Sequence, residues 1–133
     1  MEKLLVLRTL GIFNGVPDNI LHNLSTISNE QFLKAGAALF NKGDSGTSMF
    51  IIVKGRVKVH DGDKTIAVLG DREIIGELAA LSSETRSASV TALGGTRLLK
   101  ITQESLYEIM WDQREVAIEF IEILTGRLRD LMK

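Results

Sequence analysis

The sequence predicts a mainly β fold, an antiparallel sandwich or barrel with helices at both ends. Apolar residues follow helical spacing over residues 1–30 and again over 102–133, whereas residues 31–101 contain short runs rich in β-branched residues. Turn sequences with glycine and aspartate separate these runs at short intervals, as in antiparallel all-β architectures. With 133 residues, of which 44% are hydrophobic, we expect one globular domain over residues 1–133.

Two short helices are expected before the strands. The first has an apolar stripe of four leucines: Leu4, Leu5, Leu7 and Leu10. Pro17 suits the first position of the second helix, because the amide it lacks would be unbonded there anyway. The apolar face of this second helix is made by Ile20, Leu21, Leu24 and Ile27.

Five runs in the middle of the chain predict strands: 49–53, 57–60, 65–69, 87–92 and 98–101. From Arg56 to His60 polar and apolar residues alternate strictly, which is typical of a half-buried strand. The Asp61-Gly62 pair that follows predicts a hairpin turn.

Residues 102–133 return to helical spacing. Thr102 resembles a helix cap, with Glu104 as an acid in the first turn. A longer helix is predicted from about Arg114 to Leu131, with an apolar side too wide to be left in water. We expect that side to pack on the barrel, on a second copy of the chain, or on both.

Residues 76–88 depart from the strand pattern and combine groups that suit an anion and a sugar. Gly76 to Leu81 favours a single helical turn, and Gly76 lets a ligand approach the backbone closely. Arg86 can hold a phosphate with two parallel hydrogen bonds, and Glu77 can accept a proton from a sugar hydroxyl. Taken singly, each also has a simpler interpretation as a turn residue, a surface charge or a first-turn acid.

This stretch resembles the phosphate-binding cassette of the cyclic nucleotide-binding domain family. Gly76-Glu77-Leu78-Ala79, six further residues and Arg86-Ser87-Ala88 match the family pattern Gly-Glu-Leu/Ile-Ala, five or six residues, Arg-Ala/Ser/Thr-Ala. Residues 13–17, 36–44 and 49–55 resemble the leading helical segment, barrel strands and glycine turns of the family. The resemblance implies an antiparallel β-roll or jelly-roll barrel over residues 31–101, with a short helical cassette between strands and C-terminal helices.

The resemblance also implies a ligand, cAMP or cGMP, and a set of ligand-binding residues: Gly76, Glu77, Leu78, Ala79, Arg86, Ser87 and Ala88. Arg86 would hold the exocyclic oxygens of the cyclic phosphate, and Glu77 would bind the ribose 2′-hydroxyl. Backbone amides near Leu78 and Ala79, with Ser87, would complete the phosphate cradle. Ser87 leaves the base open, and cAMP is favoured on its general frequency in the family.

Several functions are excluded or disfavoured by composition. The absence of cysteine excludes disulfides, thiolate metal sites and cysteine nucleophiles. His22 and His60 have no metal-ligand spacing, and no catalytic motif is present, so neither a metal site, a cofactor nor an enzyme is expected. A formal net charge of −1 favours neither nucleic acid nor an anionic membrane as a partner. The apolar run 4–7 is too short for a signal peptide or a membrane span, so we expect a cytoplasmic protein or the cytoplasmic part of a larger one.

Three functions are compatible with these sequence features. The first is a regulatory sensor, with Val90 and barrel residues lining the sugar and base, that transmits nucleotide occupancy through its C-terminal helix to a homodimer partner or an effector domain. The second is the sensor part of a larger transcription regulator, kinase, channel or transporter. The third is a degenerate copy that binds no nucleotide.

Overall fold

The computed structural model describes residues 3–132, apart from the side chain of Leu78. The chain forms two compact units, one over Ser28–Glu104 and the other combining the N-terminal residues up to Ile27 with those from Ser105 onward. The first unit contains all eight strands described and the second is helical. The mainly β fold with flanking helices predicted from the sequence is therefore confirmed, whereas the division into domains stays a prediction.

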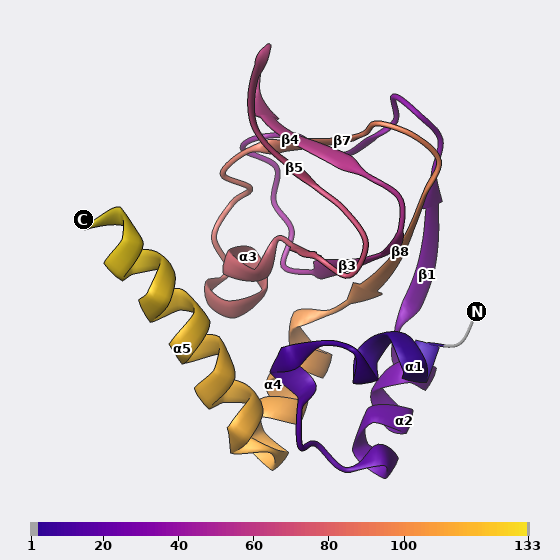
Figure 1. Cartoon of the computed structure of the whole chain (residues 1–133), viewed down its shortest axis with the longest axis vertical. Coiled ribbons are helices and arrows are strands. Elements are labelled where there is room, and N and C mark those ends of the chain that lie inside the picture. The colour runs from indigo at the N-terminus through magenta and orange to yellow at the C-terminus, as the bar shows by residue number, and fades with distance from the viewer. Residues whose placement is uncertain (1–2, 133) are drawn as a thin grey trace. The chain divides into compact units, whose positions relative to one another are not determined.

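The strand unit contains two antiparallel four-stranded sheets (Figure 1). The first has the order β1-β8-β3-β6, with β1 at Asn29–Leu33, β8 at Thr96–Ile101, β3 at Met49–Lys54 and β6 at Ile74–Ile75. The second has the order β2-β7-β4-β5, with β2 at Ala38–Phe40, β7 at Ser89–Ala92, β4 at Val57–Asp61 and β5 at Lys64–Leu69. Most neighbours in space, such as β1 with β8 and β2 with β7, are far apart in the sequence, as in a jelly roll.

The sequence located most of these strands but not their limits. The five predicted runs correspond to β3, β4, β5, β7 and β8. The predicted run 87–92 begins two residues too early, because β7 starts at Ser89 and the two residues before it complete the loop that carries Arg86. Three strands were not among the runs: β1, β2 and β6. β1 is a mostly polar edge strand, whereas β2 has three residues and β6 has two, which is too short for an alternating pattern.

The core of the strand unit lies between the two sheets. Six buried residues form it: Phe50, Ile52, Val57, Ile75, Val90 and Leu98. They come from β3, β6 and β8 of one sheet and from β4 and β7 of the other. Burial of these side chains away from water therefore holds the sheets face to face.

The hairpin between β4 and β5 confirms the turn predicted at Asp61-Gly62. Asp61 pairs with Lys64, and Gly62 between them has φ +58°. The ring of His60 is held within the sheet, since Nδ1 lies 2.9 Å from the Gly62 carbonyl and Nε2 lies 2.8 Å from Oγ1 of Thr91. These contacts give His60 a structural role.

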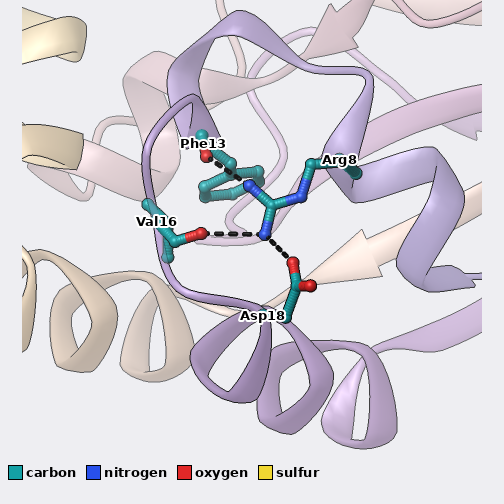
Figure 2. Close-up of polar contacts among 4 residues, drawn as sticks. All are labelled: Arg8, Phe13, Val16 and Asp18. Atoms are coloured by element: carbon teal, nitrogen blue, oxygen red, sulfur yellow. Dashed lines mark hydrogen bonds and ion pairs between the residues drawn. The ribbon is translucent and has the colours of Figure 1, made fainter.

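The helical unit begins with α1 (Lys3–Arg8), a 3-10 turn η1 (Gly11–Phe13) that the sequence did not predict, and α2 (Asp18–Ile27). The Arg8 guanidinium connects these elements (Figure 2): it donates to the carbonyl of Val16 at 2.8 Å and to that of Phe13 at 3.4 Å, and it pairs with Asp18. Because α2 begins at Asp18, Pro17 precedes the helix, and its carbonyl accepts from the Leu21 amide. The sequence placed Pro17 one position too far into the helix.

Two further helices follow the strands. α4 (Gln103–Asp112) starts in the strand unit and continues into the helical one, and α5 spans Arg114–Leu131 as predicted. Val116 and Phe120 of α5 are buried, whereas Ile121 and Leu128 further along are exposed. Within the described part of the chain, no helix is long and apolar enough to cross a membrane.

Candidate functional site

The cassette, residues 76–88, forms a short helix and a loop between β6 and β7. The helix, α3, spans Glu77–Ser82, and Gly76 precedes it in the left-handed region at φ +78°. Ser83 ends the helix at φ +59°, and its amide donates to the Ala79 carbonyl at 2.9 Å. The helical turn predicted over Gly76 to Leu81 is therefore present with the same length, shifted by one residue along the chain.

The side chain of Arg86 is buried, with 6% of its surface exposed, unlike any other charged side chain in the part of the chain described. Nη2 donates to the Ser48 carbonyl at 2.8 Å. Nη1 is also buried but has no hydrogen-bond partner among the described residues. Burial lowers the pKa of the Arg86 guanidinium, and the nearby charge of Asp44 offsets part of that effect. These facts exclude the simpler interpretation of Arg86 as a solvated surface charge.

An aromatic ring packs against this guanidinium. Cζ of Arg86 lies 4.2 Å from the ring centroid of Phe40, a cation–π distance, and 5.9 Å from that of Phe50. The two rings are 6.3 Å apart and tilted by 43°. Phe40 ends β2 and Phe50 lies in β3, so a strand from each sheet contributes to the support of Arg86.

The loop between β2 and β3 holds the main chain of Arg86. The Gly43 amide donates to the Arg86 carbonyl at 2.8 Å, and the Arg86 amide donates to the Asp44 carbonyl at 2.9 Å. The Asp44 carboxylate accepts from the Asn41 amide at 2.9 Å, which fixes the loop itself. Arg86 is thus held by both its backbone and its side chain, and this order is the preorganisation that a binding site requires.

Two glycines let the backbone approach the guanidinium closely. A β-carbon at Gly76 would lie 2.5 Å from Nη1, and one at Gly46 would lie 3.2 Å from Nη2. Nη1, the atom without a partner in the described residues, therefore faces the start of α3. The structure brings together Gly76 and Arg86, two predicted ligand-binding residues that are ten positions apart in the sequence.

The other predicted residues occupy the same segment. Glu77 opens α3 and is half-buried, and Ala79, two residues further along, is buried. Ser87 is exposed directly after Arg86, and Ala88 is half-buried before β7. Leu78 belongs to α3, but its side chain lies outside the described residues. The side-chain contacts of the guanidinium come instead from Phe40, Ser48 and Phe50, so the roles of these residues stay predictions.

Three contributors to the site were missed by sequence reasoning: Phe40, Gly46 and Ser48. Residues 43–46 were recognised only as a turn, and Phe40 only as part of a barrel segment. Ser48 is separated from Arg86 by 38 positions and contributes a carbonyl that any residue could supply. No local pattern signals such a contact, because it depends on how the sheets close.

Comparison with known proteins identifies the family. Residues 30–113 match the profile of the cyclic nucleotide-binding domain. The match covers well over half of the 133 residues and includes the whole cassette. The chain therefore belongs to the cyclic nucleotide-binding domain family.

Individual relatives agree with this assignment. The chain is 26% identical over 129 residues to the CRP-like cAMP-activated global transcriptional regulator of Mycobacterium tuberculosis, covering 93% of this chain and 58% of that protein. It resembles the N-terminal domain of a transcriptional regulator from Streptomyces coelicolor with a TM-score of 0.76, 30% identity and coverage of 95% and 92%. It also resembles the regulatory domain of Toxoplasma gondii PKA, crystallised with cAMP, with a TM-score of 0.73, 25% identity and coverage of 80% and 42%.

One of these matches is a regulatory domain and another is the N-terminal domain of a transcriptional regulator. The chain spans 58% of the length of the mycobacterial relative, so only the domain is shared across the comparison. The activity of the remaining part of the mycobacterial protein is therefore not assigned to this chain.

Proposed function

We propose that this chain binds a cyclic nucleotide at Arg86 and the cassette. The buried guanidinium carries the proposal, because its Nη1 group faces Gly76 without a hydrogen-bond partner in the described residues. An unpaired buried donor on a cation is costly, and a phosphate oxygen is a strong acceptor for it. Nη2 already donates to the Ser48 carbonyl. The phosphate would therefore be bound chiefly through Nη1 and not by two parallel hydrogen bonds from Nη1 and Nη2.

The remaining cassette residues would complete the ligand shell. Glu77 would accept a hydrogen bond from the ribose 2′-hydroxyl, since an ionised carboxylate is a pure acceptor. The amides of Leu78 and Ala79 and the hydroxyl of Ser87 would donate to the phosphate, and Ala88 would pack beside it. No metal and no further cofactor are part of this proposal.

We propose cAMP rather than cGMP as the preferred nucleotide. The mycobacterial relative is named as cAMP-activated, and the Toxoplasma regulatory domain was crystallised with cAMP. The names of the same relatives support a regulatory role, in which occupancy would be transmitted through the C-terminal helix to a second copy or to an effector domain. The chain would act as a binding module without catalytic activity of its own.

Calorimetric titration tests this proposal. We expect saturable binding of cAMP that is tighter than that of cGMP, and an affinity about 100-fold weaker in Arg86→Ala, because a charge-assisted contact to a buried anion is lost. Arg97→Ala is the matched control, since Arg97 lies exposed on β8, and its affinity should equal that of the parent.

Two results would contradict the proposal. One is the absence of heat with either nucleotide at millimolar concentration in the folded parent protein. The other is an Arg86→Ala variant that binds cAMP as tightly as the parent does. Circular dichroism on each variant establishes that it is folded before it is titrated.

A further inference from the structure

We propose that Gln103 couples the cassette helix α3 to α4, and this inference rests on the proposed function for its physiological meaning. Nε2 of Gln103 donates to the Ala80 carbonyl at 3.0 Å and to Oγ of Ser83 at 2.8 Å. Gln103 is the first residue of α4, 23 positions after Ala80 in the sequence. One side chain therefore joins the end of one helix to the beginning of another.

The contact completes the end of α3. The last carbonyls of a helix have no amide partner within the helix, and α3 is only six residues long. The Ala79 carbonyl is satisfied locally by the Ser83 amide, whereas the Ala80 carbonyl accepts from Gln103. Gln103 thus acts as a cap for α3 that is supplied from another element.

The two ends of α3 contact different parts of the structure: its beginning lies at the proposed phosphate site and its end contacts α4. Gly76 at its beginning faces Nη1 of Arg86, where the phosphate is proposed to bind. Ser83 at its end contacts Gln103. Six helical residues span about 9 Å, so a rigid displacement at one end of α3 is carried directly to the other.

The position of the start of α4 is constrained, so a displacement of α3 would affect it. Ile101, two residues before Gln103, is buried at the end of β8 and anchors the chain there. If α3 moves, the two hydrogen bonds of the Gln103 amide must break, or Gln103 must move with it. A net hydrogen bond changes an opening equilibrium by roughly 2- to 10-fold, so the coupling is large enough to measure.

Amide hydrogen exchange without nucleotide tests the connection itself. In Gln103→Ala we expect the amides of Ala80 and Ser83 to exchange roughly 2- to 10-fold faster than in the parent, because the end of α3 loses its cap. Gln113→Ala is the matched control: Gln113 precedes α5, and its side chain makes no cap hydrogen bond there. Unchanged exchange in α3 of Gln103→Ala would overturn the inference.

Addition of cAMP tests the direction from site to helix. In the parent, cAMP should slow exchange both in α3 and over residues 106–110 of α4, since coupling between two sites is reciprocal. In Gln103→Ala the slowing should persist in α3 and disappear in α4. Equal slowing of α4 in the variant and the parent would overturn the inference.

The two proposals fail in different ways. If cAMP changes no exchange rate in the parent, the proposed function fails, while the comparison without nucleotide still decides whether Gln103 couples the helices. Ser83→Ala provides a second variant that removes one of the two acceptors. It should accelerate exchange at the end of α3 less than Gln103→Ala does, and no acceleration in either variant would contradict the coupling.

Discussion

At the scale of single residues, the environment of Arg86 determines what the site can bind. Its backbone is held by Gly43 and Asp44, one face of its guanidinium rests on Phe40, and Nη2 is bonded to Ser48. These contacts fix the position of a buried cation before any ligand arrives. A binding site of this kind avoids the cost of ordering a long flexible side chain when the anion binds.

Gly76→Ala should impair the site and the fold together. The added β-carbon would meet Nη1 of Arg86 at 2.5 Å, and the backbone at φ +78° disfavours any residue with a side chain. We expect the free energy of unfolding in urea to fall by about 1–3 kcal/mol and the affinity for cAMP to fall at least 10-fold.

Gly36→Ala separates these two effects. Gly36 has φ +85°, but a β-carbon there would meet nothing within 4 Å. This control should therefore lose about 1 kcal/mol of stability and keep its affinity for cAMP. Binding by Gly76→Ala that equals binding by Gly36→Ala would contradict the placement of the ligand beside Gly76.

Phe40→Leu should weaken nucleotide binding without removing any group that contacts the nucleotide. A cation–π contact at 4.2 Å contributes about 0.5–2 kcal/mol, so the affinity for cAMP in calorimetric titration should fall by roughly 2- to 30-fold. Phe40→Tyr keeps the aromatic face and should bind as the parent does. If both variants bind alike, the ring does not orient the guanidinium.

At the scale of secondary structure elements, the sequence pattern predicted the helices and turns whose structure depends on neighbouring residues. The long helix α5 has the limits that its apolar spacing predicted, Arg114–Leu131, and the Asp61-Gly62 hairpin lies where its turn residues placed it. The strand β1 was missed because its sequence Asn29–Leu33 is mostly polar, and it forms by pairing with β8. A strand that depends on a distant partner carries little signal of its own.

The candidate site shows the same division. The cassette could be predicted because glycine, glutamate and arginine stand in a fixed order within one stretch of the sequence. Phe40 and Ser48 could not, since they reach Arg86 only after β2 and β3 take their places in different sheets. Gln103 could be predicted as a first-turn residue of α4, but not as the cap of α3.

At the scale of the whole molecule, the family and the site give the chain its proposed place as a sensor. Membership of the cyclic nucleotide-binding domain family rests on residues 30–113, which include β1 to β8 almost entirely and all of α4. The exposed apolar residues Ile121 and Leu128 on α5 lie beyond that match. The proposed function would therefore place sensing in the matched residues and output in the residues after α4.

Phosphorus NMR of cAMP reports on the proposed contact between Arg86 and the phosphate of the nucleotide. The single phosphorus resonance should shift or broaden when the parent protein is added, and should keep its free position with Arg86→Ala at the same concentrations. Arg97→Ala should behave as the parent does. A phosphorus resonance that the parent leaves unchanged, or that Arg86→Ala perturbs equally, would show that Arg86 does not bind the phosphate.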